Sequence, residues 1–142
     1  MLNEKNIRGL RMRQKEIVAT ASGSETIDVE DGGTMFMVSG TGAYTITLPL
    51  MSDAGPGWHC TFMCDGTVSG AAITIKPNGS ESTQSLLALV EHDTDVGTSD
   101  VNADTVTFTT SASKGSYLYM FTDGNYWYVN GRAGASGTFG KT

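Results

Sequence analysis

The segment that most constrains the fold is 115–131, which reads GSYLYMFTDGNYWYVNG. Two stretches rich in Tyr, Trp, Phe and Val flank Asp123, Gly124 and Asn125, and these residue types favour a pleated, half-buried strand. Asp-Gly between two such stretches favours a tight turn with a positive φ angle. The segment therefore predicts a β-hairpin and places the protein in the all-β class.

The same alternation of apolar and polar residues recurs in short pieces from Ile17 onward, with turn residues between them. We expect one antiparallel β-sandwich or barrel-like domain of about 8–10 short strands, preceded by an N-terminal arm. Only 17% of the 142 residues are charged and 18 are Gly, which suits short strands and turns better than a helical bundle. Besides the hairpin, the predicted strands are 26–30, 34–38, 43–48, 58–64, 72–76 and 105–109.

Three parts follow from this pattern. Residues 1–16 form a basic arm, either extended or a short helix, and residues 17–132 form the β body. Within the body, 77–104 is a long loop region rich in Ser, Thr, Asp and Asn, whose apolar island at 86–90 is a further candidate strand. Residues 133–142 form a Gly-rich C-terminal tail.

The net charge of −6 is unevenly distributed along the chain. Residues 1–16 carry five basic and two acidic side chains, a net charge of +3, whereas the remainder has a net charge of −9. The arm suits an acidic protein surface or a phosphate backbone, although a solvated terminus without a partner is the alternative. Because the acidic body would repel nucleic acid, we expect no nucleic-acid partner.

No apolar stretch resembles a signal peptide or a membrane span, so we expect a protein made in the cytoplasm with no membrane partner. Cys60 and Cys64 would share one face of a strand about 13 Å apart, too far for a disulfide, and we interpret both as small buried residues. The two histidines, His59 and His92, do not complete a zinc ligand motif with these cysteines.

The sequence offers no convincing catalytic or metal-binding motif. Asp93, Asp95, Asp100 and Asp104 do not fit the spacing of a calcium loop, so a solvated acidic loop is expected there. No Gly-x-Ser-x-Gly elbow is present, and 40–42 is interpreted as a turn because it lacks the third Gly of a dinucleotide site. A carboxylate pair for glycoside hydrolysis depends on the fold rather than on spacing, and stays open. We expect a protein that is not an enzyme and that needs no cofactor or metal.

Large aromatic residues form the one remaining candidate group. They would serve as core or subunit interface, with a sugar-stacking platform as the alternative. Alternation places Trp127 on the opposite face of its strand from its two neighbours, so the whole set cannot make a single platform. The set comprises Trp58, Tyr117, Tyr119, Tyr126, Trp127 and Tyr128.

Four segments carry a resemblance to a known group of proteins: GTGAYTITLP at 40–49, GWHCTF at 57–62, AITIKPNG at 72–79 and TDGNYWYV at 122–129. In this order they resemble small β-rich structural proteins of tailed bacteriophage virions, most closely the capsid decoration or cement proteins. Similar modules occur in tail fibres and spikes, and the short chain without shaft repeats favours the capsid.

The resemblance implies a non-enzymatic virion protein, made in the host cytoplasm, that binds the outer capsid surface as a homotrimer and cements subunits of the major capsid protein. The alternative is a tail-associated or receptor-binding β module that recognises cell-surface glycan. In the first case the basic arm would supply the docking contacts, with apolar anchors among its charges. The predicted docking residues are Leu2, Lys5, Ile7, Arg8, Leu10, Arg11, Met12, Arg13 and Lys15.

Overall fold

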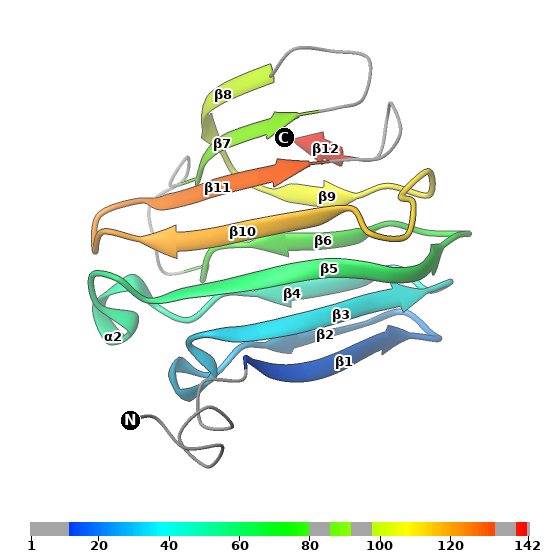
Figure 1. Cartoon of the computed structure of the whole chain (residues 1–142), viewed down its shortest axis with the longest axis horizontal. Helices are drawn as coiled ribbons and strands as arrows, with labels where there is room; N and C mark the ends of the chain where they lie inside the picture. Colours follow the sequence, from blue (N-terminus) through cyan, green and yellow to red (C-terminus); the bar gives the residue numbers. More distant parts are fainter. Residues whose placement is uncertain (1–11, 80–85, 92–97, 133–138, 142) are drawn as a thin grey trace, which may run out of the picture.

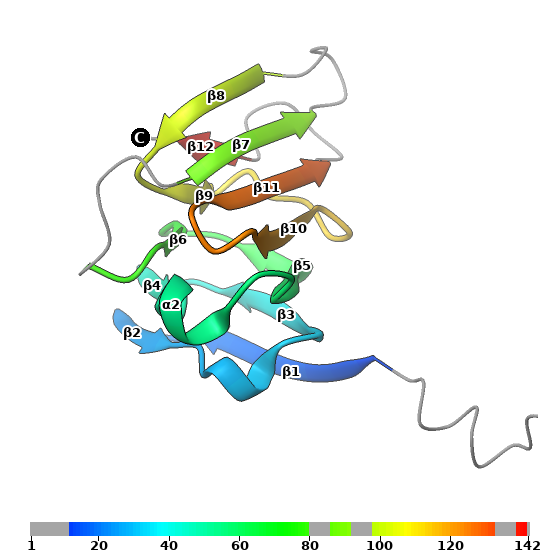
Figure 2. The same cartoon turned by 90° about the vertical axis from the view of Figure 1, so that its left-hand side faces the viewer.

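The computed structural model of the chain describes residues 12–79, 86–91, 98–132 and 139–141, and consists of two β-sheets that face each other (Figure 1). The strands of the two sheets run in similar directions, one sheet behind the other, and Figure 2 shows the two layers from the side. In spatial order, the seven-stranded sheet contains β1 (Arg13–Ala19), β3 (Thr34–Gly40), β5 (His59–Val68), β10 (Tyr117–Thr122), β11 (Trp127–Arg132), β7 (Leu86–Glu91) and β8 (Thr98–Ala103). The five-stranded sheet contains β12 (Phe139–Lys141), β9 (Val106–Phe108), β6 (Ile73–Lys76), β4 (Tyr44–Thr47) and β2 (Gly23–Thr26).

The first six strands wind alternately between the two sheets. β1, β3 and β5 are parallel neighbours in one sheet, and β2, β4 and β6 are parallel neighbours in the other. We call β1 with β2 the first coil, β3 with β4 the second and β5 with β6 the third. Arg13 pairs with Thr34 and Gly23 pairs with Tyr44, so the first two coils are offset by 21 residues in both sheets. This half of the chain is wound as a short β-solenoid.

The second half closes the stack with antiparallel pairs. β10 runs antiparallel to β5 in one sheet, and β9 runs antiparallel to β6 in the other. The predicted hairpin is present, because β10 and β11 pair from Tyr117 with Arg132 to Thr122 with Trp127. Gly124 in its turn has a φ angle of +94°, as the Asp-Gly sequence predicts.

The prediction of an all-β chain is confirmed, but the expectation of purely antiparallel pairing is wrong. Consecutive strands of the first half lie in opposite sheets, so the hydrogen-bonding neighbour of each strand is one whole coil away. Parallel neighbours require such a long crossover connection, here made by a strand of the other sheet.

Several predicted boundaries also need correction. β1 begins at Arg13, so the last four residues assigned to the arm belong to the sheet. Residues 29–31 form a short 3-10 turn instead of the end of a strand, and β5 continues past Gly66 to Val68. The loop region 77–104 contains β7 and β8, and the C-terminal tail contributes β12.

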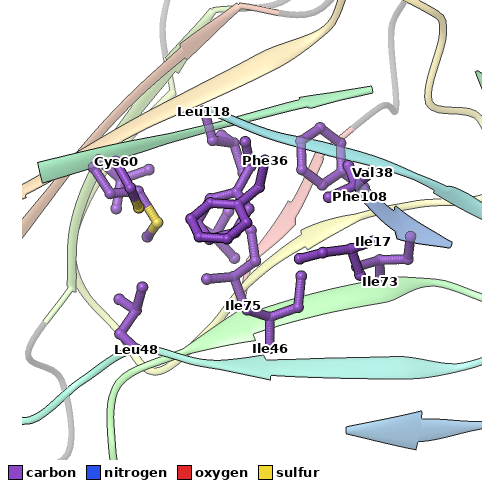
Figure 3. Close-up of a cluster of buried hydrophobic side chains, with 14 of the residues drawn as sticks. Ile17, Phe36, Val38, Ile46, Leu48, Cys60, Ile73, Ile75, Phe108 and Leu118 are labelled. Atoms are coloured by element: carbon purple, nitrogen blue, oxygen red, sulfur yellow. The ribbon is translucent and has the colours of Figure 1, made fainter. Parts of the chain in front are cut away.

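The core lies between the sheets (Figure 3). Phe36, Val38 and Leu118 from the seven-stranded sheet point toward Ile46 and Ile75 from the five-stranded one. All five side chains are buried because they occupy alternate positions along their strands. Phe36 stacks on Phe62 with ring centroids 5.2 Å apart, and this contact packs the second coil against the third.

The turn predicted at 40–42 is present, and it joins the second coil closely to the first. The N–H groups of Thr41 and Gly42 both donate to the carbonyl of Ala19 at 2.8 Å. A Cβ atom on Gly42 would lie 2.3 Å from the backbone of Ala21, and Gly40 has a φ angle of +137°. Glycine is therefore required by both contact and conformation at this corner.

Candidate functional site

The outward side of the seven-stranded sheet carries an unusual concentration of aromatic and methionine side chains. Buried residues such as Phe36, Phe62 and Leu118 point inward, so their neighbours along the strands point outward. Cross-strand pairing brings these outward residues into adjacent rows. We call this surface the outer aromatic face, and it consists of Met35, Met37, His59, Thr61, Met63, Tyr117, Tyr119, Phe121 and Tyr128.

Four rings on the outer aromatic face form a continuous row across β5, β10 and β11. The ring centroids of His59 and Tyr119 are 6.0 Å apart, and those of Tyr119 and Phe121 are 5.8 Å apart. Phe121 and Tyr128 stack at 4.9 Å with an angle of 12° between their planes. Such ring contacts hold the side chains in fixed positions, so this part of the face is ordered before any partner arrives.

The composition of this face differs from that of an ordinary protein surface. Tyr, Met and Phe predominate at its nine positions and none is Lys, Arg, Asp or Glu, while the exposed Glu16 and Arg132 pair with Met37 and Tyr117 at its margins. Tyr117 and Tyr119 are 37% and 36% exposed. Aromatic residues and Met are enriched, and acidic residues and Lys depleted, in the centres of protein–protein interfaces. The face therefore has the composition of a docking surface.

The hairpin turn supports one end of the ring row. The backbone N–H groups of Asn125 and Tyr126 donate to Asp123 Oδ1 at 2.8 and 2.9 Å, and the Tyr128 hydroxyl donates to Asp123 Oδ2 at 2.9 Å. The backbone hydrogen bond from Asn125, followed by those from Tyr126 and Tyr128, lowers the pKa of Asp123 below its usual 3.8. The same carboxylate raises the pKa of Tyr128, so this hydroxyl remains a donor at neutral pH.

The outward side of the five-stranded sheet has a different character. Ser24, Thr45, Thr74 and Thr107 pair in one row across β2, β4, β6 and β9. The hydroxyl groups of Thr74 and Thr107 are 3.2 Å apart and hydrogen-bonded. The second row contains Thr26, Thr47 and Lys76. We call these seven residues the threonine face.

The predicted docking residues are only partly within the described chain. Leu2, Lys5, Ile7, Arg8, Leu10 and Arg11 lie outside the described residues, and Met12 is exposed. Arg13 donates from Nη2 to the carbonyl groups of Glu30 and Gly32, the latter at 3.1 Å. Lys15 Nζ lies 2.6 Å from Asp31 Oδ1. Arg13 and Lys15 therefore have partners within their own chain.

The six predicted aromatic residues divide between the core and the surface. Trp58 and Trp127 are buried and meet edge to face, with centroids 5.5 Å apart, and Trp58 Nε1 donates to the Val29 carbonyl at 2.7 Å. Tyr126 is 45% exposed in the turn. Tyr117, Tyr119 and Tyr128 belong to the outer aromatic face.

Sequence reasoning missed six members of that face, namely Met35, Met37, His59, Thr61, Met63 and Phe121. The alternation in 34–38, 58–64 and 117–122 gives each of them buried neighbours along the strand, so their outward direction was readable from the sequence. That β3, β5 and β10 are neighbours was not readable, because residues 69–116 separate β5 from β10 along the chain.

The two cysteines are buried and free, as predicted. Burial raises the pKa of both thiols, and Cys64 Sγ contacts the Gly66 carbonyl at 2.9 Å. Among the described residues, no three His, Cys, Asp or Glu side chains are grouped so that they could hold a metal ion. His92, Asp93 and Asp95 lie outside the described residues, as does the side chain of Asp100.

No protein-family model, curated protein or solved structure matches this chain. In the described ranges, no helix is long and apolar enough to cross a membrane.

Proposed function

We propose that this protein is a non-enzymatic structural component of a tailed-phage virion and that it docks onto other protein subunits through its outer aromatic face. The observation that carries the proposal is this ordered, uncharged surface of Tyr, Phe and Met beside a core that is already complete without it. The phage assignment itself rests on the four segments that resemble virion structural modules. In this proposal the partner is the major capsid protein and the docked form is a homotrimer on the outer capsid surface.

Burial of the exposed rings would supply the binding free energy. Apolar surface removed from water contributes about 25 cal/mol per Å². Because the ring row is held by contacts between its own members, little side-chain entropy is lost when a partner covers it. Polar groups at the margin, such as the Asp123 carboxylate, would remain in water.

The basic segment 1–11 has a secondary role in the proposal. It would add contacts from Arg8 and Arg11 to an acidic part of the shell. Arg13 and Lys15 contribute less because they bind Glu30, Gly32 and Asp31 within the chain.

A paired substitution on each face tests the docking surface. Tyr117→Ala with Tyr119→Ala truncates two half-exposed rings, and Thr45→Ala with Thr107→Ala makes a matched change on the threonine face. Loss of two central aromatic contacts costs about 2 kcal/mol or more, which is roughly 30-fold weaker binding. Binding is measured by co-sedimentation with shells assembled without this protein.

The expected result is weaker shell binding by the tyrosine variant and unchanged binding by the threonine variant, with both folded by circular dichroism. Equal binding by both variants would reject the outer aromatic face as the docking surface. Failure of the parent protein to bind any shell or virion would reject the virion proposal itself.

Removal of residues 2–11 tests the arm separately. This boundary leaves β1 intact, whereas a deletion through residue 16 would remove four residues of that strand. We expect a modest loss of shell binding that fades in 1 M salt, where the screening length falls to about 3 Å. If shell binding by the truncated protein is as sensitive to salt as binding by the parent protein, the ionic contacts lie outside residues 2–11.

Glycan recognition is the second candidate, and the row of four rings specifically favours it. Sugar faces stack on aromatic rings, and His59, Tyr128 and Asp123 offer polar groups beside them. Tyr119→Ala is the informative variant in a glycan array, because Trp127 is fully buried and its removal would disturb the core. Array binding that Tyr119→Ala abolishes, without shell binding by the parent, would favour this alternative.

A further inference from the structure

Among the strands that the structure describes, the two of the first coil each have one edge without a neighbouring strand. In the described chain, β1 pairs only with β3 and β2 pairs only with β4. Figure 1 shows β1 and β2 together at one end of the stack. Another parallel or antiparallel coil could therefore add to both edges at once, and exposed edges of this kind are the usual route to unwanted association.

The first coil carries charged side chains at inward positions where the residues paired with them in the second and third coils are apolar. In the seven-stranded sheet, Lys15 pairs with Phe36, and Phe36 pairs with Phe62. In the five-stranded sheet, Glu25 pairs with Ile46, which in turn pairs with Ile75. The four apolar residues are buried in the core, so the first coil has a charge in each sheet where the next two coils have a core residue.

Lys15 and Glu25 lie at the end of the core that the first coil covers. Lys15 Nζ forms an ion pair at 2.6 Å with Asp31, which is only 7% exposed. Glu25 Oε1 is buried without a hydrogen-bond partner, and desolvation raises the pKa of Glu25 despite the opposing charge of Lys15. The Tyr44 ring covers the same end, since a Cβ atom on Gly23 would lie 2.9 Å from it.

The charged inward positions of the first coil are Arg13 and Lys15 in β1 and Glu25 in β2. Ile17, Ala19 and Ile27 of the first coil are buried and continue the core. The first coil is thus half core and half polar, which is the pattern of a capping repeat in solenoid proteins. Inward-pointing charges are also a known means of protecting sheet edges.

We propose that the first coil is a capping coil, in which Lys15 and Glu25 prevent a second copy of this chain from adding to the free edges of β1 and β2. A coil of another copy added to β1 and β2 would remove the half-exposed Lys15 side chain and the rest of Glu25 from water. Burial of a charge without a well-placed partner costs several kcal/mol, more than the new strand pairing returns. This inference goes beyond the proposed docking function and uses none of the residues of the outer aromatic face.

The test replaces the two charges with the residues that the second coil carries at the same register. Lys15→Phe with Glu25→Ile should extend the apolar surface of Ile17 and Ile27 across the end of both sheets, with Arg13 left at its margin. We expect the weight-average mass by sedimentation equilibrium to at least double relative to the parent protein as concentration increases. A matched control, Ser24→Phe with Thr26→Ile, adds the same side chains to the outward side of β2.

The outcome is decided by the difference between the two variants. Association of the inward variant alone supports the proposal, whereas parent-like mass for the inward variant overturns it. Association of both variants also overturns it, because the association would then result from added apolar surface anywhere on β1 or β2 and not from the inward positions. If Lys15→Phe with Glu25→Ile does not fold, the shape-conserving pair Lys15→Met with Glu25→Gln is compared with the parent under the same criteria.

Discussion

The outer faces of the two sheets are built by the same alternation, yet they present opposite chemistry. The outer aromatic face shows Tyr, Phe, Met and His in adjacent rows, whereas the threonine face shows hydroxyl groups and one lysine. Both faces cover the same core, and the inward residues of both sheets are almost entirely apolar. The core explains why the sheets pack together, but it does not explain why their outward sides differ.

This difference indicates which face to test first for a function. Threonine is a common outward residue in strands because its branched side chain suits the pleat and its hydroxyl meets water. Tyr and Phe suit the pleat as well, but rows of exposed Tyr with half-buried Phe and Met leave a contiguous apolar surface, which usually marks an interaction site. The threonine face is therefore the natural control for every experiment on the outer aromatic face.

The largest expected effect tests whether the rings of the outer aromatic face lie on the surface and not in the core. Trp127→Ala should lower the free energy of unfolding by about 3–5 kcal/mol because it empties a buried site against Trp58, whereas Tyr128→Ala should cost about 1 kcal/mol. Urea denaturation gives both values. If the neighbouring Tyr128→Ala costs as much as Trp127→Ala, the outer aromatic face belongs to the folded core and the contrast between the faces disappears.

The next effect tests the corner that keeps the two faces on opposite sides of the stack. Gly42→Ala should destabilise the protein by about 1–3 kcal/mol because its Cβ atom would collide with the Ala21 backbone. Gly79→Ala is the matched control, since a Cβ atom there meets nothing within 4 Å. Equal melting temperatures for the two variants would show that the corner is not tightly packed.

A smaller effect tests order on the threonine face. Thr74→Val and Thr107→Val each remove one hydroxyl of the 3.2 Å pair, so each should cost about 0.5–1.5 kcal/mol. The double variant should cost less than the sum of the two, because the second substitution finds no partner left to lose. Additive losses in a double-mutant cycle measured by urea denaturation would mean that the hydroxyl groups interact only with water.

The smallest effect concerns the turn that anchors the ring row. The lowered pKa of Asp123 means that its ionised form stabilises the fold above the unfolded value of 3.8, and that this contribution is lost as pH falls through the lower folded value. Asp123→Asn should therefore melt slightly below the parent at neutral pH, and the two curves should converge in acid. Asp28→Asn is the control because the Asp28 side chain makes no capping hydrogen bond. A constant difference at all pH values would contradict the assignment.

Local patterns predicted the strands and the hairpin well. Alternation in 43–48 placed Ile46 and Leu48 in the core, and Asp-Gly at 123–124 located the turn. Strand pairing was mistaken because neighbours in this fold are a whole coil apart. The 21-residue offset between the first two coils was a usable signal, since Ile17 and Ile27 occupy the same positions as Val38 and Leu48.

The part of the outer aromatic face on β10 and β11 was largely predictable, whereas the part on β3 and β5 was not, because strand pairing could not be read from the sequence. Tyr117, Tyr119 and Tyr128 were recognised as candidates from their type, and their outward direction follows from the burial of Leu118 and Trp127. The contributions of β3 and β5 required knowledge of which strands lie side by side. Neither alternation nor turn chemistry contains that information.

The sequence by itself determined the all-β class, most strands, the hairpin and the separation of inward from outward side chains. These depend on interactions between residues close in the chain, where backbone geometry leaves few choices. Only the tertiary structure decided the winding of the coils, the gathering of the outer aromatic face and the placement of Lys15 and Glu25 at the end of the stack. These depend on pairing between distant strands, which is selected by the packing of the whole core rather than by any local preference.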